Sequence, residues 1–371
     1  MADPTVSFIV PCYRLAHLLG ECVQSILSQT CADFEILIMD DCSPDNTPEV
    51  ARSFGDHRIR HVRNEPNLGH LRNYNKGLEL ARGKFVWLIS ADDRLHCDYI
   101  LQRYVDFVAA HPEAGYVFCP SFELRGGTVM GVLQGSVYRD HDAVLDGRSF
   151  LRELLDCNCI PAPAVMIRKK CLEEVGFFPL DMPFGGDWYL WCVLALRYPV
   201  GYLAEPMVDR RMHEMAMTNT MSQQNVRACV DDDLALPWRV RSEAERLGAG
   251  EIVELCRGRA AEQFGRFLAG ADIRGATAQI TVEDFQHRLA AFTGDAAERR
   301  KISAAAFLIA GDACFWRNNL GGARDMYSRA LAVRPFWPAA WVKAALARAA
   351  NPGRACRKAF ASMRSPKLKA R

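Results

Sequence analysis

Short apolar runs alternate with helical patterns through the first hundred residues of the chain. The apolar runs predict four buried strands, at residues 6–10, 34–39, 59–62 and 85–89. Pro11 is expected to stop the first strand. Apolar positions at helical spacing predict helices at residues 18–27 and 71–81. Strands and helices that alternate in this way form right-handed crossovers, so we predict an α/β fold with a mostly parallel sheet flanked by helices.

Polar residues follow three of these strands. They are the segment 11–14 and the pairs Asp40-Asp41 and Asp92-Asp93. The carboxyl ends of parallel strands meet at one edge of a sheet, where open α/β folds bind ligands, so we expect these groups to converge. A single aspartate after a strand often only caps the next helix. Two adjacent acidic pairs repel each other, and this favours a site for a ligand or cation.

The pattern changes near residue 220, where strand signals fade and helical periodicity takes over. We predict a catalytic-type domain at residues 1–220 and an all-helical accessory module at 221–353. Spacing near 303–336 is typical of one tetratricopeptide-like hairpin. Residues 354–371 form a basic tail with seven Lys/Arg and no Asp or Glu. Such a tail is either solvated or contacts an anionic lipid or acceptor.

Composition narrows the class of protein. Half of the residues are hydrophobic and the formal net charge is +2, which argues for a buried core and against a nucleic-acid partner. We find no signal peptide, and Arg197 and Pro199 interrupt the most apolar stretch, 188–204. We therefore expect a soluble cytoplasmic protein, with peripheral contact at the inner face of the membrane through the basic tail. The fourteen cysteines form no CxxC pair and are expected to be reduced thiols.

The turn after the first predicted strand lacks the sequence features of two common classes of nucleotide-binding protein. A dinucleotide-binding enzyme needs a glycine-rich turn after its first strand, and this chain has no glycine before Gly20. The phosphate-binding sequence GxxxxGK[ST] is also missing, and a nucleotidyltransferase would need glycines in the same loop. A diphosphate can instead be held through a metal. Asp92 and Asp93 offer the hard oxygen ligands that Mg²⁺ and Mn²⁺ prefer.

Several ordered motifs carry a family resemblance over roughly residues 5 to 215. They are residues 6–13 (VSFIVPCY), 25–30 (SILSQT), 34–43 (FEILIMDDCS), 67–73 (NLGHLRN) and the pair Asp92-Asp93. Together they resemble the family 2 glycosyltransferases, which have the Rossmann-like GT-A fold and use nucleotide-diphospho-sugars. The pair Asp92-Asp93 falls at the position of that family's DxD motif.

The resemblance implies roles on the donor side of a site. Pro11 and Tyr13 would line the nucleotide pocket, and Asp41 would hydrogen-bond the base. Arg72 would lie near the nucleotide. The implied donor is a nucleotide-diphospho-sugar, with a UDP-sugar as the first choice.

The resemblance also implies metal ligands. Asp92 would face the ribose or the sugar, and Asp93 would bind a Mn²⁺ or Mg²⁺ ion that bridges the diphosphate. Arg211 and His213 resemble the family's Arg-x-His, in which the histidine can complete the metal shell. An ordinary surface or core histidine is the alternative for His213.

On the acceptor side, Gly185-Gly186-Asp187-Trp188 resembles the family's loop, in which the last acid is the catalytic base, here Asp187. The alternative for Asp187 is a helix N-cap. Trp188 is a candidate to stack on a sugar, with core packing as its alternative, and Arg211 is a candidate acceptor contact.

Departures from the family pattern qualify this hypothesis. Arg14 stands where asparagine is common, and Gly186 replaces the usual acid before the base. The Q-x-x-R-W sequence of processive synthases does not follow Asp187. We therefore expect an inverting, non-processive enzyme that acts on a hydroxyl of a polysaccharide, lipopolysaccharide or glycolipid precursor. The alternative is a catalytically degenerate scaffold that acts through its helical module.

Overall fold

The computed structural model describes residues 3–273 and 276–348. The chain separates into two compact units, Met1–Met221 and Ser222–Arg371. The predicted basic tail, 354–371, lies outside the described residues. Within the described part of the chain every cysteine is a free thiol. No described helix is both long enough and apolar enough to cross a membrane.

The first unit is built on an eight-stranded sheet with the order β3-β2-β1-β4-β10-β6-β11-β9. Neighbouring strands are parallel except where β10 meets β4 and β6 and where β9 meets β11. The strands of this sheet are β1 (Val6–Cys12), β2 (Phe34–Asp40), β3 (Ile59–Arg63), β4 (Phe85–Leu88), β6 (Tyr116–Phe118), β9 (Ala143–Leu145), β10 (Val165–Arg168) and β11 (Val200–Tyr202). The predicted α/β architecture is confirmed.

A second sheet of four strands has the order β5-β12-β7-β8. Its strands are β5 (Arg94–Leu95), β7 (Ser121–Arg125), β8 (Thr128–Val132) and β12 (Val208–Arg211). The helices of the first unit are α1 (Ala16–Leu27), α2 (Thr47–Ser53), α3 (His70–Leu80), α4 (Ile100–Ala110), α5 (Gly147–Leu154), η1 (Ala162–Ala164), α6 (Lys169–Val175) and α7 (Gly186–Arg197). Helix α8 (Met217–Gln224) spans the division between the two units.

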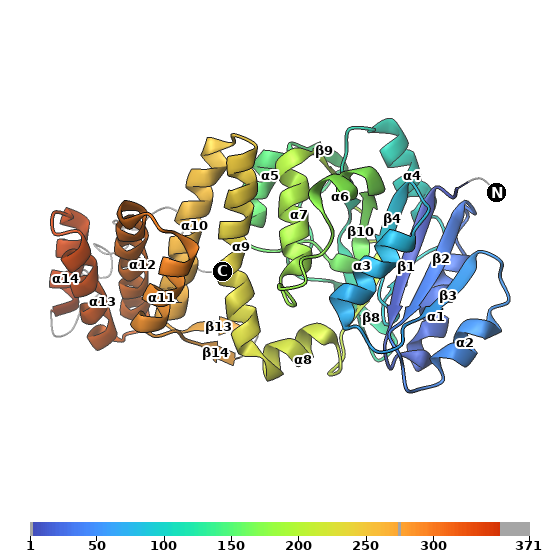
Figure 1. Cartoon of the computed structure of the whole chain (residues 1–371), viewed down its shortest axis with the longest axis horizontal. Helices are drawn as coiled ribbons and strands as arrows, with labels where there is room; N and C mark the ends of the chain where they lie inside the picture. The colour runs from blue at the N-terminus through green and yellow to red at the C-terminus, as the bar shows by residue number, and fades with distance from the viewer. Residues whose placement is uncertain (1–2, 274–275, 349–371) are drawn as a thin grey trace. The chain divides into compact units, whose positions relative to one another are not determined.

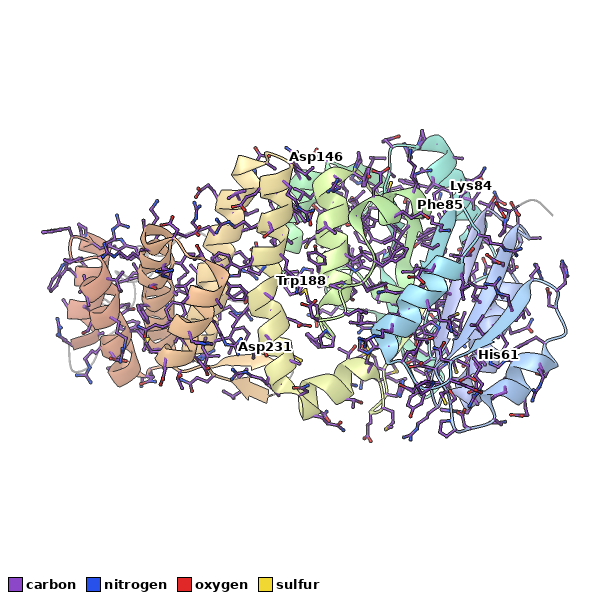
Figure 2. All side chains as sticks on the ribbon, in the orientation of Figure 1. His61, Lys84, Phe85, Asp146, Trp188 and Asp231 are labelled. Atoms are coloured by element: carbon purple, nitrogen blue, oxygen red, sulfur yellow. The ribbon has the colours of Figure 1, made fainter. Side chains whose placement is uncertain are left out.

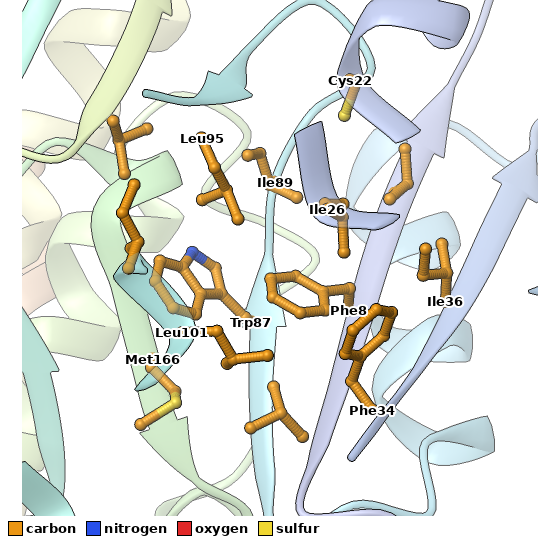
Figure 3. Packing of buried hydrophobic residues seen from close by; sticks show 14 of the residues in the cluster. Phe8, Cys22, Ile26, Phe34, Ile36, Trp87, Ile89, Leu95, Leu101 and Met166 are labelled. Carbon is orange, nitrogen blue, oxygen red and sulfur yellow. The ribbon is translucent and has the colours of Figure 1, made fainter. Parts of the chain in front are cut away.

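Alternating side chains of β1 face two different layers. Phe8 and Val10 belong to a core that includes residues of α1 and α4. Figure 3 shows Phe8 beside Trp87, whose ring centroid lies 5.4 Å away in a stacked arrangement. Ile9 points to the opposite face, where α3 covers the sheet (Figure 1). There a Cβ on Gly77 would lie 2.6 Å from Ile9 Cγ2, so only glycine lets α3 approach the sheet this closely.

Strand β1 continues through Pro11 to Cys12, so the prediction that Pro11 ends this strand is wrong. In a parallel strand, alternate residues direct their backbone N–H and C=O groups to the same neighbouring strand. The carbonyls of Ile9 and Pro11 face the β4 side, where they accept hydrogen bonds from the N–H groups of Ile89 and Ala91. Proline lacks a backbone N–H, and on this side β4 has already ended at Leu88. The missing donor therefore costs the sheet no strand-to-strand bond.

The second unit consists mainly of helices. They are α9 (Val226–Arg246), α10 (Gly250–Leu268), α11 (Val282–Phe292), α12 (Ala296–Trp316), α13 (Leu320–Val333) and α14 (Pro338–Arg348). Residues 303–336, where a tetratricopeptide-like hairpin is predicted, fall mostly on α12 and α13, and Gly311 packs on the ring of Tyr327 there. The expectation of an all-helical module is wrong in one detail, because β13 (Ala271–Ile273) and β14 (Ala276–Ala278) pair as an antiparallel hairpin. The β-branched residue Thr277 favours this local strand pairing.

Candidate active site

The acidic turn after β4 is held by the end of β12. The backbone N–H of Arg211 donates to Asp93 Oδ1 at 2.8 Å, and its Nε donates to the carbonyl of Asp92 at 2.7 Å. The same guanidinium pairs with Glu21 of α1. The side chain of Arg211 is only 9% exposed. These bonds hold the acidic turn in place, and contact of Arg211 with an acceptor stays a prediction.

His213 lies beside Asp92. Its Nε2 is 2.9 Å from Asp92 Oδ2, whereas the sequence prediction grouped His213 with Asp93 as metal ligands. Burial is the largest single effect and would raise the pKa of Asp92, but the hydrogen bonds with His213 and Ser90 and the charge of His213 together outweigh it and lower that pKa. Burial and the charge of Asp92 raise the pKa of Asp93 well above its usual range. The two neighbouring carboxyl groups thus differ in how readily they ionise.

The acidic turn has an unsatisfied acceptor. Asp92 Oδ1 is buried and accepts no hydrogen bond within the described residues. A buried carboxylate oxygen without a partner is costly, and a cation would satisfy it. In the described ranges no group of three or more His, Cys, Asp or Glu side chains converges as a metal cage. Two carboxylates without a full protein cage suit Mg²⁺-type ions, which take substrate phosphates and water as further ligands.

The acidic pair after β2 divides into two structural roles. Asp40 is fully buried, and its carboxylate accepts from Ser43 N at 2.8 Å and from Arg63 Nη1 at 2.6 Å. Asp41 Oδ1 accepts from Leu68 N at 2.8 Å, and Oδ2 accepts from Gly69 N at 2.9 Å. Asp41 therefore fixes the turn that leads into α3. Its contact with a nucleotide base stays a prediction.

Asn64 links Asp41 to helix α3. Its Nδ2 donates to Asp41 Oδ1 at 2.9 Å and to Asn73 Oδ1 at 2.7 Å, and Asn73 in turn donates to the carbonyl of Met39. All of these side chains are buried. The sequence does not identify Asn64 as a site residue, because no residue near it indicates that its side chain bonds to Asp41, which follows strand β2.

The remaining donor-side candidates lie around the same sheet edge. Pro11 is buried at the end of β1, and Tyr13 is 43% exposed just beyond it. The Arg14 guanidinium lies over the Tyr13 ring, 5.2 Å from its centroid. Arg14 has φ +58°, a left-handed conformation that asparagine adopts more readily, so the turn keeps a geometry that suits the family's usual residue. Arg72 is exposed on the first turn of α3.

Asp187 lies in the first turn of α7, which begins at Gly186 after the N-cap Gly185. The alternative interpretation, in which Asp187 is the N-cap of this helix, is therefore wrong. Its Oδ1 accepts from the backbone N–H of Trp188 at 2.6 Å. Trp188, labelled in Figure 2, is half-buried, and its Nε1 donates to the carbonyl of Leu154 at 2.6 Å. This bond fixes the indole, and stacking of Trp188 on a sugar stays a prediction.

Tyr74 of α3 has a pKa that depends on all four of the predicted acids. Burial raises the pKa of its phenol above the ordinary value, and the charges of Asp92, Asp187, Asp93 and Asp41 raise it further. All four predicted acids thus raise the pKa of one side chain, Tyr74, which the sequence analysis did not identify. A tyrosine within a helical pattern carries no signal that distinguishes it from core packing.

Comparison with known proteins places these features in a family. Residues 7–174 match the model of Glycosyl transferase family 2. A PGL/p-HBAD biosynthesis glycosyltransferase of Mycobacterium bovis is 34% identical over 229 residues, which are 57% of this chain and 83% of that protein. An uncharacterized protein of Mycobacterium tuberculosis is 30% identical over 251 residues, 64% of this chain and 76% of that protein.

A solved structure supports the fold. The crystal structure of Staphylococcus aureus TarS 1-349 in complex with UDP-GlcNAc superimposes with a TM-score of 0.61 at 18% identity, covering 90% of this chain and 93% of that one. The fold is thus of the GT-A type with a C-terminal helical region. From the matching family model and the M. bovis relative, the chain belongs to glycosyl transferase family 2 and is a glycosyltransferase.

Proposed function

We propose that this glycosyltransferase is inverting and non-processive, and that it moves one sugar from a nucleotide-diphospho-sugar to a hydroxyl acceptor. The observation that carries the proposal is that Asp187, Asp92 and Asp93 all raise the pKa of the same side chain, Tyr74. Inverting transfer needs a base for the acceptor on one side of the anomeric carbon and charge stabilisation for the leaving group on the other. The absence of Q-x-x-R-W after Asp187 supports transfer of single sugars.

In this proposal Asp187 is the general base. A neutral hydroxyl is a poor nucleophile, so a carboxylate within hydrogen-bond reach must take its proton as the new glycosidic bond forms. Asp187 is half-buried in the first turn of α7, where the helix N-terminus favours negative charge. The Oδ1 bond to the backbone of Trp188 orients the carboxylate.

Asp92 and Asp93 are the residues that would hold Mn²⁺ or Mg²⁺, and His213 bonds to Asp92 beside them. The unsatisfied Asp92 Oδ1 supports this assignment. A divalent ion there supplies positive charge next to the departing nucleoside diphosphate. Arg211 keeps the acidic turn in place through its bonds to Asp92 and Asp93.

The donor would lie along the edge formed by Pro11, Tyr13, Asp41 and Arg72. The exposed Tyr13 ring provides a flat surface for a base, and the exposed Arg72 guanidinium provides positive charge for phosphate. TarS, which shares the fold, holds UDP-GlcNAc, so a UDP-sugar is the first donor to test. The M. bovis relative is named for biosynthesis of PGL and p-HBAD, and this supports a glycan or glycolipid hydroxyl as acceptor.

The test begins with a thermal-shift screen of nucleotide-sugars on the full chain in the presence of MnCl₂. A ligand that binds only the native state raises the melting temperature, by an amount that grows with its concentration over Kd. Release of nucleoside diphosphate from the best donor is then measured with and without EDTA, with water taking the sugar in place of the acceptor hydroxyl. We expect binding of at least one nucleotide-sugar and release that EDTA abolishes. A chain that binds no nucleotide-sugar in the screen would support the scaffold alternative instead.

A further inference from the structure

The segment that leads to Asp187 contains no helix or strand. It runs from Gly176, which follows α6, to Gly185, which precedes α7. Such a segment has no ladder of backbone hydrogen bonds to fix its position, so other contacts must do so. Helix α3 supplies several of them.

Asn75 of α3 makes the most specific of these contacts. Its Nδ2 donates to the carbonyl of Phe178 at 2.9 Å, and its Oδ1 accepts from the N–H of the same residue at 3.0 Å. One side-chain amide thereby satisfies both backbone groups of a residue 103 positions away in the chain. An amide pair of this kind fixes the segment in direction as well as in distance, because both bonds must form together.

Two neighbours of Asn75 on α3 hold the same segment. His70 Nε2 donates to the carbonyl of Pro183 at 3.0 Å, and burial lowers the pKa of His70, which favours the neutral ring. The Tyr74 ring meets the Phe178 ring edge-on, with centroids 5.7 Å apart. Phe178 lies near the beginning of the segment and Pro183 near its end. Both residues therefore contact one helix, α3.

The backbone next to Asp187 also lies on α3. A Cβ on Gly186 would lie 3.5 Å from Leu71 Cδ2 and 3.8 Å from Phe178 Cδ1. The first turn of α7 therefore rests on the start of α3. That start follows the turn whose Leu68 and Gly69 amides bind Asp41. One rigid helix thus touches the Asp41 side and the Asp187 side of the site.

We propose that Asn75 is a positioning residue for Asp187, which it holds at a fixed place relative to the bound donor through its paired bonds to Phe178. The inference rests on the proposed function, in which Asp187 is the base. Misplacing a catalytic group by about 1 Å can cost about 100-fold in rate, so a loosened segment should slow transfer even though Asn75 does not touch the substrates.

The test compares Asn75→Ala, Asn75→Asp and the matched control Glu79→Ala, which alters an exposed residue on the same helix. The donor selected in the thermal-shift screen is the probe, and nucleoside diphosphate release is the measured rate. We expect kcat of Asn75→Ala to fall about 10- to 100-fold while KM for the donor changes less than about 2-fold. Asn75→Asp keeps the acceptor for Phe178 N but loses the donor, so its loss should be intermediate. Glu79→Ala should behave as wild type.

A second measurement does not depend on activity. Hydrogen exchange of peptides covering residues 176–187 should be faster in Asn75→Ala than in Glu79→Ala, while peptides from β1 and β2 should be unchanged. Unchanged exchange at residues 176–187 would overturn the proposal. If Asn75→Ala does not fold, Asn75→Asp carries both measurements.

A double-mutant cycle separates this inference from the proposed function. If Asn75 acts through Asp187, Asn75→Ala should cause little further loss in an Asp187→Asn background. Losses that multiply would refute the positioning role while leaving Asp187 as the base. Full activity of Asp187→Asn alone would refute the base assignment itself, and with it the role of Asn75.

Discussion

Glu298 is the buried charge on which the packing of the helical unit depends most clearly. Its side chain is 4% exposed at the start of α12. Oε1 accepts from Arg241 of α9 and from Arg257 of α10, each at 2.7 Å, and Oε2 accepts from Thr293 at 2.6 Å. One carboxylate therefore joins three helices. Removing its charge should loosen all three contacts together.

The pKa of Glu298 gives the size of the effect. Burial alone would raise this pKa, but the bonds from Thr293, Arg241 and Arg257 outweigh it and lower the pKa to about 2. Relative to an ordinary value of 4.5, the shift corresponds to about 3 kcal/mol of stability at neutral pH. Because the folded-state pKa is the lower one, this contribution is present above about pH 4.5 and is lost as the pH falls towards 2, with about half remaining near pH 3.

The assay is hydrogen exchange of α9, α10 and α12 peptides in Glu298→Gln, which reports the helical unit alone. We expect Glu298→Gln to lower the free energy of opening by about 2–3 kcal/mol at pH 7, and the gap from wild type to shrink as the pH falls below 4.5. The matched control is Glu245→Gln, because Glu245 pairs with the same Arg241 but is 48% exposed and should contribute less than about 1 kcal/mol. Equal effects of the two substitutions, or a gap that does not shrink with pH, would refute this reasoning.

Three further predictions test other parts of the molecule. Gly311→Ala would place a Cβ 2.4 Å from the Tyr327 ring and should lower the free energy of unfolding by about 1–3 kcal/mol, measured by thermal unfolding. The control Gly258→Ala, where a Cβ meets nothing within 4 Å, should be neutral or stabilising. A neutral Gly311→Ala would contradict the packing of α12 on α13. Arg211→Lys keeps the charge but loses the geometry that joins Asp92 to Glu21, so UDP binding with MnCl₂ should weaken about 10-fold by calorimetry. The control Arg125→Lys, at an exposed residue of β7, should match wild type, and unchanged affinity in Arg211→Lys would argue against a positioning role. Deletion of residues 354–371 should reduce sedimentation with anionic liposomes, since each basic residue near such a surface contributes about 1 kcal/mol, and no change would refute the proposed membrane contact.

The sequence was sufficient for those parts of the fold that depend on local patterning. Continuous apolar runs predicted β1, β2 and β4, because strands buried on both faces need no polar positions. Pro11 was misinterpreted because its effect depends on where the neighbouring strand ends, and the sequence of β1 does not contain that information.

The candidate site was predictable in its residue types but not in its partners. The acids follow strand ends or a glycine-rich turn, and these signals are local. The pairing of His213 with Asp92 joins residues 121 positions apart, and the bridge from Arg211 to Glu21 spans 190. Such contacts depend on how β12 and α1 meet the acidic turn, and neither element carries a local sign of it. Tyr74 and Asn75 were missed for the same reason.

The most direct test of the account is the rate of nucleoside diphosphate release by Asp187→Asn with saturating donor and MnCl₂, set against donor affinity measured by calorimetry. Asp140→Asn is the matched control, since its side chain is 98% exposed. We predict that Asp187→Asn binds the donor as wild type does and loses about 100- to 10,000-fold in rate, the range that general base catalysis supplies, while Asp140→Asn keeps both properties. A rate for Asp187→Asn equal to that of wild type would contradict the assignment of Asp187 as the base.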